Sequence, residues 1–288
     1  MVPHKISAVI ICYNPDIIRL IDNVFSVYKQ IMSLLLIDNN SVNYEEYSNH
    51  IRNLLPSDFK LDIIRNKSNF GIARSLNIAI DYCLQNNYTW LLTLDQDSVC
   101  DLTMIEQLFD KEISRKVGLL APKIIDINNP KTRILNLKAP ITHITSGSVI
   151  NIEIAKSVGG FDGKLFIDYV DHEFCLKLLV KGYDLHYSPD ALLFQEIGKT
   201  SMHNFFGKKV YTTNHLPFRL YFQFRNRTYV NKKYFFHFPL WVFKDILKEI
   251  QSILLIMIYE KNKLSKLNCI IRGIFHGTFN IFDSELSS

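Results

Sequence analysis

The chain has 288 residues, of which 48% are hydrophobic and 21% charged, with only 11 glycines and 9 prolines. This composition excludes a disordered chain, a collagen-like repeat and a low-complexity linker, and the length fits one α/β domain with an appendage. Residues 1–198 carry 19 basic and 23 acidic side chains and residues 199–288 carry 14 and 5, so a basic C-terminal region follows a mildly acidic body.

Three features indicate the cell compartment. The longest uninterrupted apolar run, residues 253–259, has seven residues, far fewer than the ~20 of a membrane-spanning helix. The apolar stretch at 8–12 is too short for a secretory signal and has no cleavage site. The five cysteines are scattered and contain no CxxC pair, which argues against zinc fingers and disulfide scaffolds. We therefore expect a cytosolic protein.

Strand-like and helix-like segments alternate along the first hundred residues. In chain order they are residues 6–12 (strand), 16–29 (helix), 34–38 (strand), 43–55 (helix), 61–65 (strand), 71–85 (helix) and 90–95 (strand). The nearly continuous apolar strands are typical of a sheet covered on both faces. We predict an α/β fold with a doubly wound, mostly parallel sheet, whose ligand lies beyond the carboxyl ends of the strands.

Polar residues follow three of these strands. They are Tyr13 and Asn14, Asp38 to Asn40, and Asp95 to Asp97. The sequence contains neither a GxGxxG after the first strand nor a GxxxxGK[S/T], which argues against dinucleotide binding and P-loop NTPases. On an extended segment Asp95 and Asp97 face one side, and paired carboxylates suit Mg²⁺ or Mn²⁺ held jointly with a diphosphate. A strand-end aspartate is alternatively a turn former or a helix N-cap.

Six segments in a fixed order resemble the inverting glycosyltransferases of family 2, which have the GT-A fold, and look most like the bacterial rhamnosyltransferase branch. They are residues 8–14 (AVIICYN), 36–41 (LIDNNS), 69–80 (NFGIARSLNIAI), 94–97 (LDQD), 159–162 (GGFD) and 166–183 (FIDYVDHEFCLKLLVKGY). The resemblance implies a GT-A catalytic domain at 1–205, which binds the nucleotide sugar and the acceptor. A basic, amphipathic helical region is expected at 206–288.

The resemblance also implies roles on the donor side. Asp38 would accept a hydrogen bond from the imide N–H of a uracil or thymine base, and Arg74 would contact a phosphate. Asp97 would bind the metal directly, with Asp95 toward ribose or metal, and the cation would act as a Lewis acid on the leaving nucleoside diphosphate. The implied donor-binding set is Tyr13, Asn14, Asp38, Asn40, Asn69, Gly71, Arg74, Asp95, Gln96 and Asp97.

On the acceptor side, inversion requires a base that takes the proton of the acceptor hydroxyl. The resemblance implies Asp171, at the start of a predicted helix, with Glu173 or Asp168 as alternatives; acids there could instead complement the helix dipole. Asp168, Glu173 and Arg225 would bind the acceptor, and Arg225 would contact a phosphate of the donor or of a lipid carrier. Related sequences often have a histidine where this chain has Gln195, so metal dependence is left open, with Glu196 or His203 as alternative ligands.

The C-terminal region has an apolar stripe at helical spacing. It consists of Leu240, Phe243, Leu247, Ile250, Leu254 and Met257, with Lys244, Lys248 and Gln251 expected opposite. Such a helix suits peripheral contact with an anionic membrane, here the inner face of the cell membrane. Packing on its own domain or on a homodimer partner is the alternative. We expect no nucleic-acid binding, because no recognised module is present.

These observations predict transfer of a sugar, L-rhamnose from dTDP-L-rhamnose or another dTDP- or UDP-linked donor, to a saccharide or lipid-linked acceptor in bacterial surface polysaccharide (O-antigen or capsule) synthesis. A non-catalytic sugar-nucleotide-binding or membrane-scaffolding subunit is one alternative, motivated by Gln195 and by Val170, where glutamate is common. A nucleotidyltransferase is a weaker one, because residues 12–15 lack its Gly- and Arg-rich first loop.

Overall fold

The computed structural model describes residues 5–127, 141–196, 201–205 and 207–282. They fold as two compact units. The first unit contains the described residues up to 166 and from 170 to 196, and the second contains 167–169 and 201–282.

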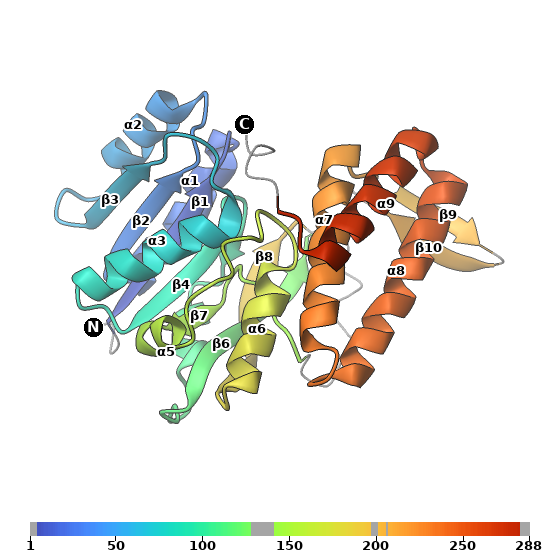
Figure 1. Cartoon of the computed structure of the whole chain (residues 1–288). Helices are drawn as coiled ribbons and strands as arrows, with labels where there is room; N and C mark the ends of the chain where they lie inside the picture. Colours follow the sequence, from blue (N-terminus) through green and yellow to red (C-terminus); the bar gives the residue numbers. More distant parts are fainter. Residues whose placement is uncertain (1–4, 128–140, 197–200, 206, 283–288) are drawn as a thin grey trace. The chain divides into compact units, whose positions relative to one another are not determined.

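Within the described residues, an eight-stranded sheet forms the centre of the first unit, with the order β3-β2-β1-β4-β7-β6-β8-β5 (Figure 1). Its strands are β1 (Ile6–Cys12), β2 (Ser33–Asp38), β3 (Lys60–Arg65), β4 (Trp90–Asp95), β5 (Val99–Cys100), β6 (Val117–Asp126), β7 (Val149–Asn151) and β8 (Asp184–Gln195). Strands β1 to β4 are parallel, as predicted. The short β7 pairs antiparallel with both β4 and β6, and β8 pairs parallel with β6. The carboxyl ends of β1, β2, β4 and β8 therefore share one edge of the sheet.

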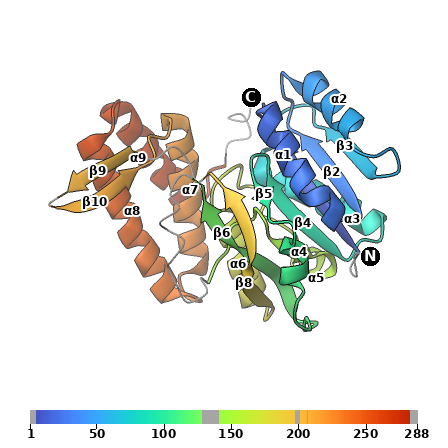
Figure 2. The same ribbon diagram turned by 180° about the vertical axis from the view of Figure 1, so that it is seen from behind.

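Helices cover both faces of this sheet. On one face lie α3 (Gly71–Gln85), α5 (Ile152–Ser157) and α6 (Val170–Val180) (Figure 1). On the other lie α1 (Ile17–Val27) and α4 (Met104–Leu108), and α2 (Tyr44–Leu54) packs beside α1; a short 3₁₀ helix, η1 (Tyr28–Gln30), follows α1 (Figure 2). Every residue of β1 is buried. This burial on both faces explains why the strands are apolar without alternation.

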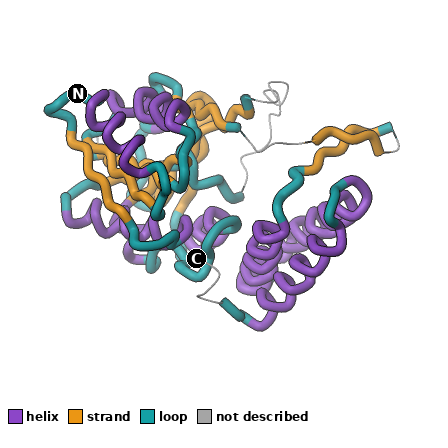
Figure 3. Tube along the Cα trace, turned by 90° about the horizontal axis from the view of Figure 1, so that it is seen from above, coloured by secondary structure: helices purple, strands orange, loops and turns teal. Residues whose placement is uncertain are grey.

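In the part of the second unit that the structure describes, three helices and a hairpin are formed (Figure 3). Its elements are β9 (Ser201–Phe205), β10 (Lys208–Thr212), α7 (Pro217–Tyr234), α8 (Pro239–Tyr259) and α9 (Lys263–Phe279). Leu220, Phe224, Ile256 and Ile270 form its core. None of the helices in the described ranges has the length and apolar character that crossing a membrane requires.

A buried ion pair joins α7 to α8. Arg227 Nε lies 2.8 Å from Asp245 Oδ2, and Asn231 Nδ2 and the Tyr169 hydroxyl donate to the same carboxylate at 2.9 Å. Burial opposes the charge of Asp245, but the bonds from Arg227 prevail and lower its pKa. The network holds Tyr169, which belongs to this unit, against the helices.

The face of α8 that packs is not the predicted stripe. Val242, Asp245 and Ile256 are buried, whereas Leu247 and Leu254 are 50% and 56% exposed. Lys244 and Lys248 are also exposed. The expectation that the lysines lie opposite the stripe is therefore wrong, because the packed face occupies the side of the helix away from both. The stripe and the lysines share the exposed side of the helix.

Candidate active site

The loops that follow β1, β2 and β4 are tied together by hydrogen bonds. The backbone N–H of Tyr13 donates to Gln96 Oε1 at 2.9 Å, and Gln96 Nε2 donates back to the Tyr13 carbonyl at 3.4 Å. The N–H of Asn14 donates to Ser41 Oγ at 2.9 Å, and Asn14 Oδ1 accepts the N–H of Val42 at 2.9 Å. Three of the four predicted donor-binding segments thus meet at the carboxyl edge of the sheet. The Tyr13 ring is half exposed there.

Asp38, at the end of β2, is fully buried. Its carboxylate accepts the Tyr47 hydroxyl at 2.8 Å and the Ser41 N–H at 3.1 Å, and Arg65 Nε lies 3.6 Å away. These partners already satisfy the carboxylate. The predicted bond to a nucleobase stays a prediction and would require this cluster to open; the exposed Asn40 lies two residues further on.

The fourth donor segment is the start of α3, where the predicted helix bounds are those observed. Asn69 Oδ1 accepts the N–H of Gly71 at 2.9 Å, and the N–H of Ile72 donates to the carbonyl of Phe166 at 2.7 Å. Gly71 has a φ of +74°, and a Cβ there would lie 2.4 Å from that carbonyl oxygen. The glycine of this motif therefore permits the segment that leads into α6 to pass directly over the helix start.

Two side chains of α3 hold the turn at residues 160–163. Asn77 forms a two-way amide bridge to the backbone of Phe161, with distances of 2.8 and 2.9 Å. Arg74 Nε donates to the carbonyl of Gly163 at 3.1 Å, and the rest of its exposed guanidinium has no other hydrogen-bond partner among the described residues. Arg74 can therefore still bind an anion with its terminal nitrogens.

The sequence analysis predicted an extended Asp95–Asp97 segment, but the structure has a turn here. Strand β4 ends at Asp95, and the chain turns so that the N–H of Ser98 bonds the Asp95 carbonyl at 3.3 Å. Ser146 Oγ accepts the N–H of Asp95 at 3.0 Å, and Gln195 Nε2 donates to Asp95 Oδ2 at 2.7 Å. The turn alters the predicted alignment of the two carboxylates. Gln195, at the end of β8, positions Asp95.

Asp97 is half-buried beside two further charged groups. Burial raises the pKa of the Asp97 carboxyl, and Glu196 adds to this effect while Arg19 opposes it. Arg19 Nη1 forms an ion pair with Glu196 Oε2. No three histidine, cysteine, aspartate or glutamate side chains lie close enough to hold a metal by themselves in the ranges described. A cation here would have to share its ligands with a bound molecule.

The predicted base and one of its alternatives lie at the start of α6. Asp171 is half-buried, and its Oδ1 accepts the N–H of His172 at 2.7 Å. Glu173 is fully buried and pairs with Lys177 at 3.1 Å. Of these two acids, Asp171 is the one with solvent access.

Two predicted acceptor residues belong to the second unit. Asp168 pairs with Arg219 at 3.3 Å and has a φ of +61°. Arg225 is only 1% exposed, and its guanidinium lies over the rings of Phe222 and Phe282 at 4.7 and 4.9 Å. Contact of Arg225 with a phosphate would require this packing to open, so that role also stays a prediction. His203 bonds Thr212 across the hairpin at 2.9 Å.

Sequence reasoning missed several residues that build this site. Asn39 Oδ1 accepts from Asn66 Nδ2 at 2.8 Å and from Ser75 Oγ at 3.0 Å, which ties the end of β2 to α3. Asn39 and Asn77 both lie within motifs that the sequence analysis singled out, but their polar side chains gave no sign of facing inward. Arg19 lies outside every motif.

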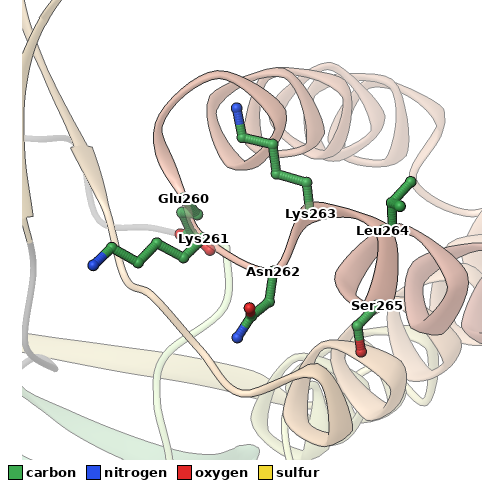
Figure 4. Close-up of a pocket in the computed structure, with 6 residues that line it drawn as sticks. All are labelled: Glu260, Lys261, Asn262, Lys263, Leu264 and Ser265. Atoms are coloured by element: carbon green, nitrogen blue, oxygen red, sulfur yellow. The ribbon is translucent and has the colours of Figure 1, made fainter.

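A separate hollow lies at the turn between α8 and α9 (Figure 4). Six consecutive residues, Glu260 to Ser265, line it, and the Lys261 and Lys263 side chains extend in different directions. Glu260 is buried and pairs with Lys266 at 2.5 Å. The lining contains none of the predicted site residues.

Comparison with known families and proteins identifies the enzyme class. The model of the family described as glycosyl transferase family 2 matches residues 7–161, more than half of the chain. The chain belongs to this family. The matched segment contains the three strand-end loops and the start of α3 described above. The protein is therefore an inverting glycosyltransferase that transfers a sugar from a nucleotide sugar.

Individual proteins support this assignment. The chain is 29% identical over 282 residues to a dTDP-rhamnosyl transferase, RfbF, of Shigella flexneri, and the match covers 90% of each sequence. Among solved structures, it is similar to the mannosyltransferase PcManGT of Pyrobaculum calidifontis, with a TM-score of 0.62, 11% identity, and 96% of this chain and 88% of that one covered. It also resembles GalNAc-T7, with a TM-score of 0.57 and 16% identity, where 77% of this chain matches 47% of the other. The structural matches show the GT-A fold of this glycosyltransferase.

Proposed function

We propose that this glycosyltransferase moves L-rhamnose from dTDP-L-rhamnose to a saccharide or lipid-linked acceptor of a bacterial surface polysaccharide. The observation that carries the choice of sugar is the match to a dTDP-rhamnosyl transferase over 90% of both sequences. The donor would lie at the carboxyl edge of the sheet, along Tyr13, Asn14, Asn40 and the start of α3. The half-exposed Tyr13 ring offers a face for the base, and the helix N-terminus and Arg74 offer donors to phosphate.

Asp171 would act as the base. Its carboxylate would take the proton of the acceptor hydroxyl while the hydroxyl oxygen attacks the anomeric carbon from the face opposite the leaving group. The bond from that carbon to the diphosphate oxygen breaks, and the nucleoside diphosphate leaves with the electron pair. Two observations support this role: Asp171 forms no ion pair within the described residues, and it retains solvent access. A carboxylate without a cationic partner remains available to a proton.

The residues near Asp97 fit a divalent cation, Mg²⁺ or Mn²⁺. Besides the carboxylates of Asp95 and Asp97, Gln195 Oε1 is buried and has no hydrogen-bond partner among the described residues. Carboxylate and amide oxygens are the ligands that such cations prefer, and Mg²⁺ usually takes one or two protein carboxylates together with substrate phosphates. When bound, the cation would stabilise negative charge on the departing diphosphate. Mn²⁺ is named in the structures of both PcManGT and GalNAc-T7.

The exposed side of α8 would lie on the anionic inner face of the cell membrane. Its stripe of exposed leucines and Phe243 would enter the interface, and Lys244 and Lys248 would contact lipid phosphates. The net charge of +9 on residues 199–288 supports this placement. It would bring the enzyme to a lipid-linked acceptor.

The Asp171→Asn variant tests the proposal. We expect sugar transfer from dTDP-rhamnose to fall by about 10²- to 10⁴-fold, the usual contribution of a general base, while the affinity for dTDP is unchanged. The matched control is Asp184→Asn, an exposed aspartate at the start of β8, which should retain full activity. Absence of transfer by the wild-type protein from any dTDP- or UDP-linked sugar would instead favour a non-catalytic subunit.

A further inference from the structure

Arg19 lies in an unusual position for a surface arginine. It is in the first turn of α1, directly after the loop that follows β1, and Asp16 caps this helix by accepting the N–H of Arg19. Its guanidinium forms an ion pair with Glu196, the residue after β8, which is 177 positions away in the sequence. The pair therefore closes the same edge of the sheet that carries the donor-binding loops.

The surroundings of Arg19 are acidic. Glu196 and Asp97 both interact electrostatically with its guanidinium, as does Asp16. The Glu196 side chain is 17% exposed, whereas that of Arg19 is 45% exposed. The guanidinium thus acts as a counter-cation for the Glu196 carboxylate, with which it pairs directly, and contributes to the electrostatics of the half-buried Asp97. Because the Arg19 side chain is nearly half exposed, water screens the ion pair, which is therefore weak and can be exchanged.

We propose that Arg19 binds the diphosphate of the donor by exchanging partners. Without donor it neutralises Glu196 and Asp97. With a divalent cation held at Asp97, the positive charge of Arg19 would no longer be required beside these carboxylates, and its guanidinium would donate to the oxygens of the β-phosphate. A guanidinium is suited to this exchange because its planar fork binds carboxylate and phosphate equally in a two-bond geometry. The inference rests on the proposed function, since it requires a nucleoside diphosphate at this edge.

The exchange predicts effects of opposite sign, which a purely structural role of Arg19 would not produce. In Arg19→Gln the carboxylates lose their internal cation, so Mn²⁺ alone should bind several-fold more tightly. The same variant should bind dTDP with Mn²⁺ roughly tenfold more weakly, the loss of one charge-assisted contact. Binding of dTMP, which has no β-phosphate, should be unchanged. Arg19→Lys keeps the charge but not the fork, so Mn²⁺ should bind as in the wild type and dTDP more weakly.

The experiment uses the full chain. Free Mn²⁺ is measured by electron paramagnetic resonance, and nucleotide binding by titration calorimetry, for the wild type, both Arg19 variants and Arg115→Gln. Arg115 is an exposed arginine before β6, at the opposite edge of the sheet, and its variant should match the wild type.

Tighter Mn²⁺ binding together with weaker dTDP binding in Arg19→Gln supports the proposal. The proposal is overturned if the affinities of Arg19→Gln for Mn²⁺ and for dTDP change in the same direction or do not change. It is also overturned if the variant loses as much affinity for dTMP as for dTDP. If the wild type binds neither dTDP nor UDP, the proposed function itself fails.

Discussion

Gly71 lies where the start of α3 meets the segment before α6. Any other residue here would be destabilising for two independent reasons. Its backbone would be strained at a φ of +74°, and its Cβ would lie 2.4 Å from the carbonyl oxygen of Phe166. Gly159 has a similar φ of +86°, but a Cβ there would meet nothing within 4 Å. We expect Gly159→Ala to lower the free energy of unfolding by about 1 kcal/mol through backbone strain alone. Gly71→Ala should cost at least about 1 kcal/mol more through the clash.

Urea unfolding of both variants measures this difference. Because both glycines have a positive φ, the backbone strain is similar in the two variants, and the comparison isolates the effect of the clash. Equal losses of stability in the two variants would show that the Phe166 segment moves away without cost, and that the close approach is not needed for the fold.

His143 makes stability depend on pH. Burial lowers the pKa of its imidazole from 6.5 to about 4, and its ring stacks on Tyr187 at 5.7 Å. The unfolded chain takes up a proton as the pH falls below 6.5, whereas the folded chain does so only near 4. His143 therefore contributes stability that is present above 6.5 and lost between 6.5 and 4. Over the step from pH 7 to pH 5 we expect a loss of about 2 kcal/mol.

The His143→Phe variant checks this prediction, since its ring can keep the stacking but cannot titrate. The difference in unfolding free energy between pH 7 and pH 5 should be about 2 kcal/mol smaller than in the wild type. His50→Phe, at an exposed position, should keep the wild-type dependence. An unchanged slope in His143→Phe would mean that the folded chain accommodates the charged imidazole.

The positions of single residues in the fold were more predictable from the sequence than their exposure. Motif order placed Asp171, Asn69 and Gly71 where the structure has them. It did not show that Asp38 and Arg225 are buried, because burial depends on partners such as Tyr47 and Phe282 that come from other elements. Arg19 could not be found at all, since its partner is 177 residues away.

At the scale of elements, periodicity predicted the strands and helices of the first hundred residues closely. Apolar runs and helical spacing are local properties, so residues 71–85 and 90–95 were obtained with the observed bounds. The insertion of β7 between β4 and β6 depends on pairing between distant segments, which no local pattern encodes. The turn after Asp95 was missed for a related reason: Ser146, 51 residues away, holds the strand end.

Helix α8 is the element on which the membrane proposal depends. Replacing Leu247 and Leu254 with aspartate places two charges in the exposed stripe without touching the packed face. We expect the double variant to bind anionic vesicles at least about tenfold more weakly. Leu102→Asp, at an 80% exposed position in the first unit, is the matched control and should bind like the wild type.

Vesicle flotation with anionic and with neutral lipids measures this binding. Sedimentation of the same variants distinguishes the other partner considered for this helix. If the double variant keeps its vesicle binding but changes from dimer to monomer, the stripe is a contact between copies of the chain and the membrane proposal is contradicted.

At the scale of the whole molecule, the chain folds as two units with separate cores. The first unit carries the family match, the strand-end loops and Asp171. The second carries the basic excess and the exposed apolar stripe. The difference in charge between the two parts was readable from composition, because it does not depend on the fold. This division predicts that donor binding is a property of the first unit and membrane binding a property of the second.

The most direct test of the central claim is thermal unfolding of the full chain with dTDP, UDP, GDP or CMP, each with Mn²⁺ or with a chelator. A nucleotide at a hundred times its dissociation constant adds about 2.7 kcal/mol, which corresponds to a rise of about 5 to 11 °C for a chain of this size. We predict that dTDP with Mn²⁺ gives the largest rise and that the chelator reduces it. If the chelator leaves the rise with dTDP unchanged, nucleotide binding does not require a metal ion. No rise with any of the four nucleotides would contradict a donor site at the carboxyl edge of the sheet.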